Sequence, residues 1–348
     1  MWRPGGARRA KRHEASGRLD SRPMEALSLD RFERAAADYD ACVAQSADVD
    51  LFCTSSDWIL PAAAAFGVSG APWIRRGPQG FAALMEVELQ GGLAALQPLE
   101  AVWGLACPVI GADVEPLALE FADELAKSPQ RRHVLLLCGL ERDSTRFHAL
   151  VRALVPRYEL RLGPETRRYV ASLENGVDGF LARRSANFRD SIRKATRRAA
   201  LERVSFTRCD PRLEDAPAVY ERLLAIERES WKGHEGVGLE ASAMVEFYRA
   251  MVPRLIRRGA LRLVFATRDG EDLAYILGGL FAGTYRGLQF SFREGFENLS
   301  LGNLCQMEQI ASLAEEVVAL YDLGTDVEYK KRWGEIEHET VTVIAFPR

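Results

Sequence analysis

The sequence contains no apolar run that approaches the ~18 residues needed for a membrane-spanning helix. Its longer apolar stretches, such as residues 60–68, are short and lie far from the N-terminus. The N-terminal segment also lacks the apolar core of a secretory signal peptide. We therefore expect a soluble protein with no membrane span.

Cysteine and histidine are scarce. The six cysteines form no C-x-x-C pair, and the five histidines show no metal-ligand spacing with one another or with cysteine. Most of the cysteines lie in apolar runs such as residues 135–138, where a thiol behaves as a small apolar side chain. We therefore predict no metal, no tightly bound cofactor and a reducing, cytoplasmic location.

The 348 residues are 47% hydrophobic and 27% charged, which predicts about two domains with ordinary packed cores. The net charge of −3 conceals a split, because residues 1–22 carry a net +5 and the rest of the chain carries −8. Residues 1–24 are poor in large apolar side chains, and we expect them to be disordered. This tail is an unstructured extension, a start placed upstream of Met24, or an arm for acidic partners.

The first half of the chain alternates between helical and strand periods, with Gly and Pro between the segments. We expect helices at 29–43, 58–66, 116–126 and 145–155, and extended segments at 72–74, 80–89, 93–98, 133–138, 158–162 and 168–173. Such alternation is typical of a layered α/β domain.

The second half repeats this order. We expect helices at 177–201, 216–231, 242–258 and 302–317, and strands at 204–208, 261–267, 272–281, 285–292, 319–323 and 339–346. The turns at 269–270 and 283–284 are too short for parallel crossovers, so the strands that they join form an antiparallel meander. The fold class is therefore α/β (α+β), with two tandem domains at 25–164 and 165–348. Each is expected to be a mixed, mainly antiparallel sheet flanked by helices.

The loop before the helix at 302–317 is a candidate anion site, formed by Ser300, Leu301, Gly302, Asn303 and Leu304. The first N–H groups of a helix have no intrahelical acceptor, and small residues let a pyrophosphate approach them. A Ser N-cap followed by Gly is also a common way to begin any helix. The order of meander, loop, helix and strand resembles that of the GNAT acetyltransferases, which bind acyl-CoA.

Residues 322–334, DLGTDVEYKKRWG, end a predicted strand and continue into a turn-rich segment. The Arg-rich stretch FRDSIRKATRR, Trp231 and the SLGN loop accompany this motif. Together they resemble the CelD-type (cellulose-biosynthesis-associated) acetyltransferases, a family of the GNAT superfamily related to the FemABX peptidyltransferases. The resemblance covers residues 165–346 well and residues 45–160 only by architecture.

The resemblance implies roles for two residues of this motif. In FemABX-like enzymes a lysine at the position of Lys330 serves the tetrahedral oxyanion, which suits a compact cation. Tyr329 is expected to donate a proton to the leaving sulfur, as a tyrosine does in many GNAT enzymes, although that tyrosine usually lies on a helix after this strand. The alternative is structural, with Asp322 capping the turn, Trp333 packed on the sheet and the lysines in solvent. The first domain is expected to be a degenerate copy that shapes the acceptor groove.

The general base is expected near the end of the helix at 216–231, where GNAT acceptor sites form. Our candidates are Glu229 and His234, with Glu227 and Glu235 close by in the sequence. His234 has a suitable intrinsic pKa and lies in a Gly-flanked segment that can act as a lid. A lone loop histidine is also often solvent-exposed and without a role.

Residues 181–203 hold eight basic residues against two acidic ones. Arg189, Arg193 and Arg197 fall on one row of the predicted helix, opposite an apolar stripe. Like charges four residues apart disfavour the isolated helix, and a phosphate-bearing partner would compensate. Candidates are the 3′-phosphate of CoA, an acyl carrier protein, an acidic peptide and tRNA, and the alternative is a solvated basic face. We assign Arg193 and Arg197 to the donor site.

The sequence thus predicts an N-acyltransferase that moves an acyl group from acyl-CoA, its co-substrate, or from an acyl carrier protein to an amine of a small molecule, sugar or peptide. An aminoacyl-tRNA donor, as in FemABX enzymes, is an alternative within this class. A non-catalytic module that binds nucleic acid through the basic helix and tail is the alternative from another class, and its binding would fall steeply with salt.

Overall fold

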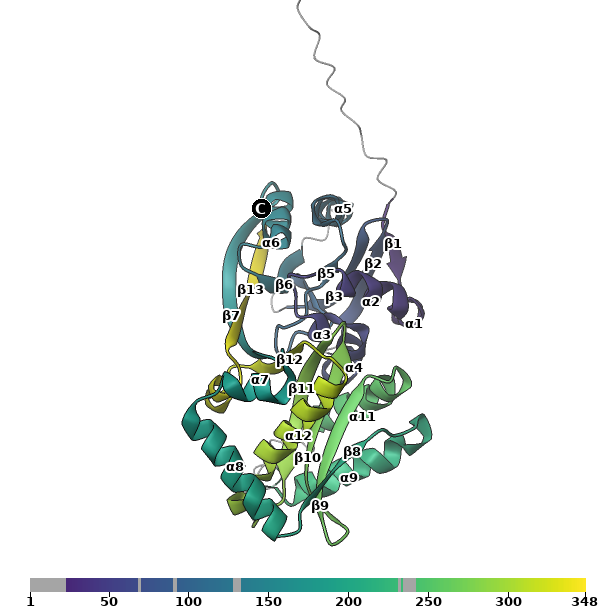
Figure 1. Cartoon of the computed structure of the whole chain (residues 1–348). Helices are drawn as coiled ribbons and strands as arrows, with labels where there is room; N and C mark the ends of the chain where they lie inside the picture. The colour runs from purple at the N-terminus through teal and green to yellow at the C-terminus, as the bar shows by residue number, and fades with distance from the viewer. Residues whose placement is uncertain (1–22, 68–69, 90–92, 128–132, 231–232, 234–241) are drawn as a thin grey trace, which may run out of the picture.

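The computed structural model describes residues 23–67, 70–89, 93–127, 133–230, 233 and 242–348 (Figure 1). Residues 1–22 of the predicted tail and the candidate base His234 lie outside these residues. Among the described residues, no helix is long and apolar enough to cross a membrane.

The strands of the described residues form one sheet (Figure 1). Their spatial order is β1 (Glu25–Leu27), β2 (Gly70–Gly77), β3 (Gly80–Glu88), β4 (Ala94–Pro98), β6 (His133–Glu141), β13 (Ile336–Pro347), β7 (Tyr158–Ser172), β12 (Leu320–Thr325), β11 (Thr284–Phe292), β10 (Glu271–Phe281), β9 (Leu261–Arg268) and β8 (Ser205–Cys209), with β5 (Val109–Ile110) beside β3. The pairs β4–β6 and β11–β12 are parallel, and the other pairs are antiparallel. The predicted mixed, mainly antiparallel α/β architecture is confirmed.

Helices flank this sheet. The first half contains α1 (Leu29–Arg34), α2 (Ala36–Ala44), α3 (Leu51–Thr54), α4 (Ser56–Phe66), α5 (Val114–Ala126) and α6 (Thr145–Leu154). The second half contains α7 (Gly176–Ala182), α8 (Ala186–Leu201), α9 (Ala216–Arg228), α11 (Ser242–Arg257) and α12 (Leu301–Glu315). Short 3-10 helices occur at η1 (Leu213–Asp215), η2 (Glu297–Leu299) and η3 (Glu328–Arg332).

Three predicted segments differ in the structure. The single helix predicted at 29–43 is divided at Ala35 into α1 and α2. The single helix predicted at 177–201 is divided into α7 and α8. Ser185 is extended, with φ −62° and ψ 155°, and its side chain accepts a hydrogen bond from the N–H of Phe188, so it begins a new helix as an N-cap. The extended segments predicted at 158–162 and 168–173 belong to one long strand, β7.

The two halves exchange their closing strands. Each half has a meander, a helix and a strand parallel to the last meander strand, namely β2–β3–β4, α5 and β6, then β9–β10–β11, α12 and β12. β7 then pairs with β12 of the second half, β13 pairs with β6 of the first half, and β7 pairs with β13. The halves therefore share one sheet, and the predicted boundary after residue 164 falls inside β7. The division into two domains stays a prediction.

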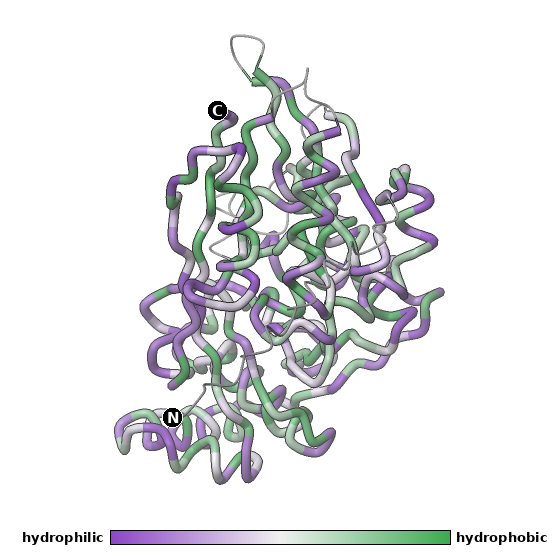
Figure 2. The backbone as a smooth tube through the Cα atoms, turned by 90° about the horizontal axis from the view of Figure 1, so that it is seen from above, coloured by the Kyte–Doolittle hydropathy of each residue, from purple (hydrophilic) through white to green (hydrophobic). Residues whose placement is uncertain are grey.

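Alternate residues of β9 face two different helical layers, because side chains alternate across a strand. Val264 and Ala266 pack with Leu301 of α12, whereas Leu263 and Phe265 belong to the core that includes α9 and α11. Figure 2 shows hydrophobic residues in green running through interior segments, with hydrophilic residues frequent at the periphery. Strand β9 is therefore covered on both faces.

Aromatic rings join the two halves. The ring centroid of Phe247 in α11 lies 5.0 Å from that of Trp58 in α4 and 5.3 Å from that of Trp103. Edge-on and tilted pairs at these separations are favourable. They place an apolar wall from the first half beside β11 of the second.

Candidate active site

The parallel pair β11–β12 is short. Its register joins Thr284 with Leu320, Tyr285 with Tyr321 and Arg286 with Asp322. Beyond Arg286 and Asp322, the described residues of β11 and β12 do not pair with each other. The two strands are therefore no longer held at the ~4.8 Å spacing of a sheet, and they diverge. We call the space between the diverging strands the wedge.

Two cavities open at the wedge. The wedge cavity, of about 260 Å³, has Phe290 and Tyr329 in its wall. The interface cavity, of about 160 Å³, lies between the halves and has Trp58 in its wall. Residues 287–289 and Lys330 line both cavities. Lys330 therefore lies where the two cavities meet.

The approach of Lys330 to β12 depends on a glycine. The Nζ of Lys330 donates to the carbonyl oxygen of Thr325 at 2.9 Å. Gly324 has a φ of +84°, in the left-handed region that favours glycine, and a Cβ on Gly324 would lie 3.3 Å from Nζ of Lys330. The Asp-Leu-Gly-Thr sequence thus ends the strand with a residue that leaves room for the ammonium group.

Tyr329 lies beside Lys330 and faces the wedge cavity. Its ring centroid is 5.8 Å from that of Phe290. Burial raises the pKa of Tyr329 to about 12, so the phenol is protonated at neutral pH. The raised pKa also makes this phenol a weaker acid than a free tyrosine, and its role as the proton donor to the leaving sulfur stays a prediction.

The structural roles considered for this motif are also present. The ring of Trp333 lies 4.9 Å from that of Phe188 and 5.9 Å from that of Phe180. Oδ1 of Asp322 accepts a hydrogen bond from the N–H of Gly324 at 2.7 Å. The same motif therefore packs the fold and brings Lys330 to the wedge.

Helix α12 starts within the predicted anion loop, next to the wedge cavity. Ser300 has a φ of +56°, and Leu301 and Leu304 are buried. The N–H groups of Leu301, Gly302 and Asn303 donate to no acceptor among the described residues. A Cβ on Gly302 would lie 2.9 Å from the ring of Phe290, so a glycine lets the helix start close to the cavity wall.

Of the two predicted general bases, only Glu229 lies within the described residues. Glu229 pairs with Arg293 at 3.0 Å, and 58% of its side chain is exposed. It lines neither cavity. Glu227, two residues earlier, is fully buried and accepts a hydrogen bond from the hydroxyl of Tyr275 at 3.0 Å.

Arg193 and Arg197 lie on α8, which packs beside the first turn of α12 (Figure 1). The contact is made by Ala195 and Ala199 against Leu304. Both arginines are on the exposed face, and Arg193 pairs with Asp190 at 2.9 Å. The described structure places neither arginine in the wall of the wedge cavity or the interface cavity.

A buried cluster of four charges, absent from the sequence predictions, holds the closed end of the wedge. Nη1 of Arg286 donates to Asp50 at 2.8 Å and to Asp322 at 2.9 Å. Arg168 lies 3.3 Å from Asp50 and also pairs with Asp322. Burial alone would raise the pKa of Asp50, but the charges of the two arginines and the N–H of Cys53 outweigh it and lower the pKa to about 2. We call these four residues the charge cluster.

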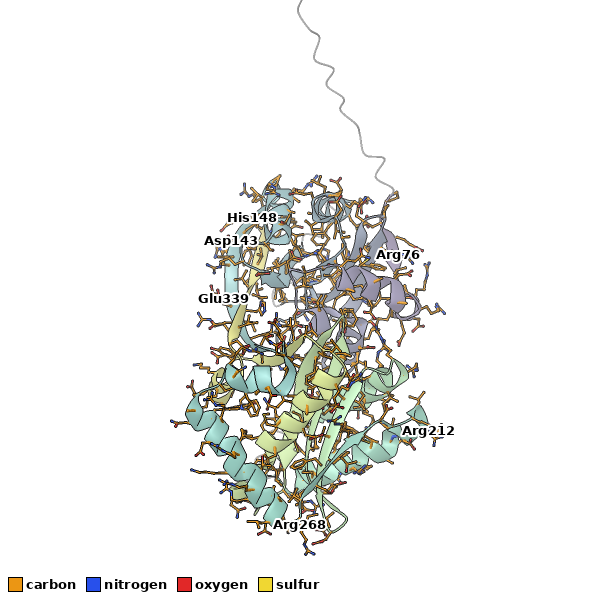
Figure 3. All side chains as sticks on the ribbon, in the orientation of Figure 1. Arg76, Asp143, His148, Arg212, Arg268 and Glu339 are labelled. Atoms are coloured by element: carbon orange, nitrogen blue, oxygen red, sulfur yellow. The ribbon has the colours of Figure 1, made fainter. Side chains whose placement is uncertain are left out.

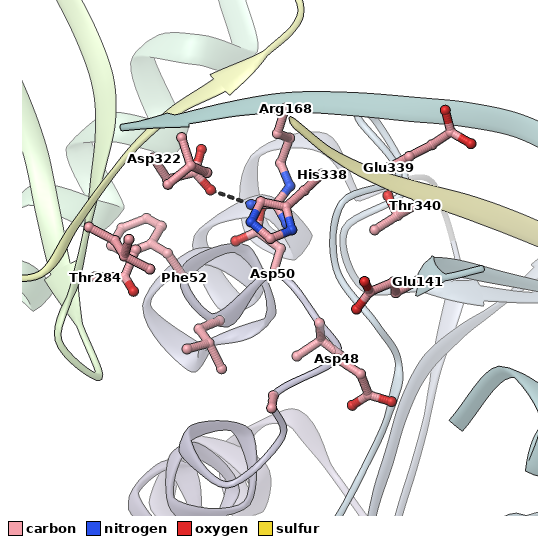
Figure 4. Close-up of a pocket in the computed structure, with 15 residues that line it drawn as sticks. Asp48, Asp50, Phe52, Glu141, Arg168, Thr284, Asp322, His338, Glu339 and Thr340 are labelled. Atoms are coloured by element: carbon pink, nitrogen blue, oxygen red, sulfur yellow. Dashed lines mark hydrogen bonds and ion pairs between the residues drawn. The ribbon is translucent and has the colours of Figure 1, made fainter. Parts of the chain in front are cut away.

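A third cavity, of about 120 Å³, lies on the other side of the charge cluster (Figure 4). Arg168, His338 and Thr340 line it.

Elsewhere His148 lies 3.8 Å from Asp143 at the periphery (Figure 3). No group of three or more His, Cys, Asp or Glu side chains is placed to hold a metal ion within the residues that the structure describes.

The first half has a corresponding divergence of parallel strands, β4 and β6, which pair over only three residues. Here a segment of the chain itself fills the space. Glu100 is fully buried and accepts from the N–H groups of Trp103, Leu105 and Ala106 at 2.7, 3.1 and 3.2 Å. A side chain at Gly139 of β6 would overlap the backbone of this segment. The counterpart of the wedge is therefore occupied.

Comparisons with known proteins agree with this geometry. Residues 183–332 match the family model described as an acetyltransferase (GNAT) domain. This span contains both strands of the wedge, helix α12 and Lys330. No curated protein sequence matches the chain. Residues 183–332 are therefore similar to a GNAT acetyltransferase domain, whereas the CelD-type subfamily stays a prediction.

Solved structures with the same fold cover nearly the whole chain. FemX has a TM-score of 0.63 at 15% identity, over 91% of this chain and 97% of FemX. The C-terminal domain of a putative lysylphosphatidylglycerol synthetase from Agrobacterium fabrum has a TM-score of 0.53 at 11% identity, over 89% of this chain and 92% of that domain. A conserved protein of unknown function from Bacteroides thetaiotaomicron has a TM-score of 0.58 at 12% identity, over 92% of this chain and 99% of that protein. At these identities the likeness concerns the fold alone.

Proposed function

We propose that this protein is an N-acyltransferase of the CelD type, which transfers an acyl group from acyl-CoA or an acyl carrier protein to an amine. The observation that carries the proposal is the position of Lys330 at the junction of two cavities. The wedge cavity receives the acyl thioester, and the interface cavity receives the acceptor. The GNAT domain match over residues 183–332 supports this arrangement.

The reaction needs an oxyanion donor and two proton transfers. The amine nitrogen attacks the carbonyl carbon, and the new C–N bond leaves negative charge on the carbonyl oxygen beside the ammonium of Lys330. Collapse of this intermediate breaks the C–S bond, and the phenol of Tyr329 protonates the departing thiolate. The amine gives its proton to a general base, for which His234 stays our first candidate, because Glu229 pairs with Arg293 and lines neither cavity.

The donor phosphates are proposed to bind at residues 300–304. Three N–H groups at the start of α12 have no acceptor among the described residues, and the helix dipole favours an anion there. The basic face of α8 lies next to this helix and adds positive charge through Arg193 and Arg197. That exposed face also favours an aminoacyl-tRNA donor as the second candidate.

Calorimetric titration of the purified protein with acetyl-CoA, octanoyl-CoA and tRNA distinguishes these donors. We expect a CoA thioester to bind, with an affinity that falls only modestly between low and moderate salt. If the protein binds tRNA but neither CoA thioester, the proposal of an acyl-CoA donor is wrong. The double variant Arg193→Ala with Arg197→Ala should weaken tRNA binding and reduce its salt dependence if α8 contacts the nucleic acid, and it should weaken binding of the CoA thioester if the two arginines add charge to the donor site.

Replacing Tyr329 with phenylalanine should lower kcat by about tenfold and leave donor affinity unchanged. The loss is modest because a thiolate leaves without complete protonation, given the ordinary thiol pKa of about 8.5. Steady-state kinetics and donor titration on the same protein check this result. Unchanged kcat would remove Tyr329 from the mechanism.

A further inference from the structure

We propose that the acceptor bound in the interface cavity is an amine that also carries a carboxylate, and that Arg286 binds this carboxylate. The inference deepens the proposed acyltransferase function and rests on it. It is carried by the hydrogen bonding of Arg286, by the position of its guanidinium beside Lys330, and by the apolar side chains that both halves place in the cavity wall.

The guanidinium of Arg286 is bound along one edge only. Nη1 donates to Asp50 and Asp322, at 2.8 and 2.9 Å. Nε and Nη2 donate to no acceptor among the described residues, although only 4% of the side chain is exposed. Unlike Nε of Arg168, which is buried without a partner, these two donors are not sealed from the interface cavity that Arg286 lines, so an acceptor that enters the cavity can bind them. This edge therefore suits an anionic ligand.

The unpaired edge faces the proposed reaction centre. A Cβ on Gly324 would lie 3.5 Å from both Nε and Nη2 of Arg286 and 3.3 Å from Nζ of Lys330. The guanidinium edge and the ammonium group thus flank one backbone position, and all three residues line the interface cavity. A carboxylate on Arg286 would hold the rest of the acceptor next to the donor carbonyl at Lys330.

The charge cluster fixes this edge in place. Asp50 and Asp322 hold the opposite side of the guanidinium, and Arg168 balances the second negative charge of the cluster. The free edge presents two parallel N–H groups, a geometry that matches the two oxygens of a carboxylate. Because the group is buried, its interaction with an anion is screened less than at the surface.

The wall of the interface cavity also carries apolar side chains from both halves, beside the polar residues Gln289 and Thr325. Trp58, Trp103 and Leu105 belong to the first half, and Met244 and Leu288 to the second. These side chains suit an apolar body on the acceptor. The combination selects a small amine with a carboxylate and an apolar group, as in an apolar α-amino acid, over a sugar amine.

The test compares two probes that share an apolar body and differ in charge, 3-phenylpropionate and 3-phenylpropanamide. Calorimetric titration of the full-length protein should show the carboxylate binding at least tenfold more tightly than the amide. Arg286→Lys keeps a cation for Asp50 and Asp322 but loses the two parallel N–H groups, and it should remove this preference. Arg168→Lys is the matched control, because it alters the same cluster outside the interface cavity and should keep the preference.

Equal binding of the two probes to the wild-type protein, or binding of neither, overturns the inference without the use of any variant. Equal loss of the preference in Arg286→Lys and Arg168→Lys also overturns it, because Arg286 would then act only through the stability of the cluster. No donor is present in these titrations. Failure of the acyltransferase proposal in the CoA titrations is therefore distinguishable from failure of this inference.

Discussion

Replacing Lys330 with methionine is expected to lower kcat for acyl transfer by about 10²–10³-fold, the usual effect of removing one oxyanion donor. Methionine keeps the length and apolar stem of the side chain and removes the charge. The ammonium lies at the junction of the wedge and interface cavities, so its loss leaves the developing negative charge without a cation. Steady-state kinetics with the donor that binds in calorimetry provide the measurement.

Lys331→Met is the matched control for this experiment. Lys331 is the next residue of the same 3-10 helix, but it pairs with Glu328 at 2.8 Å and 45% of its side chain is exposed. Its replacement should leave kcat and donor affinity unchanged. Full turnover by Lys330→Met, or equal losses in the two variants, would contradict the catalytic role of Lys330.

Lys330 was singled out by the resemblance to the CelD-type acetyltransferases, and the motif that carries this resemblance is one local stretch of the sequence. Gly324, Tyr329 and Lys330 lie within seven consecutive residues, and the strand end, the glycine and the following turn are all visible in that stretch. The start of α12 was accessible for the same reason, as a small-residue loop before a helical period. A motif made of consecutive residues can be recognised in the sequence without information about distant contacts.

The charge cluster was not predictable in the same way. Its members come from the N-cap of α3 and from β7, β11 and β12, and each is separated from the next by many residues. No spacing in the sequence connects Asp50 with Arg286, because the contact exists only after the two halves pack together. An isolated aspartate before a short apolar run indicates an N-cap, and Asp50 does accept a hydrogen bond from the N–H of Cys53 at 3.0 Å.

The exchange of β7 and β13 was hidden for a related reason. Both segments have the alternating pattern of a strand, and that pattern does not record the partner of a strand. Sequence order alone assigned β13 to the second half, whereas it lies between β6 and β7. The alternating pattern of residues therefore predicted where the strands lie in the sequence. Which distant strands pair with each other became known only from the structure.

Replacing Asp50 with asparagine is expected to cost about 3–5 kcal/mol of unfolding free energy at neutral pH, because it leaves two buried arginines with one carboxylate. The side chain of Asp50 is 2% exposed, so water cannot replace the lost charge. The variant should also lose part of the acid sensitivity of the wild type. The pKa of Asp50 is lowered from 3.8 to about 2 on folding, so its contribution to stability is complete above pH 4 and disappears as the pH falls through 2.

Urea denaturation of both proteins between pH 2 and pH 7 measures the two effects together. Asp48→Asn is the matched control, since Asp48 lies two residues away, is 22% exposed and pairs with one arginine, Arg146, at 3.2 Å. Because Arg146 keeps hydrogen bonds to Ser46 and to the carbonyl oxygen of Val109, the control should lose only about 1 kcal/mol. Equal losses in the two variants, or an unchanged acid slope in Asp50→Asn, would mean that the charge cluster does not hold the two halves together at the wedge.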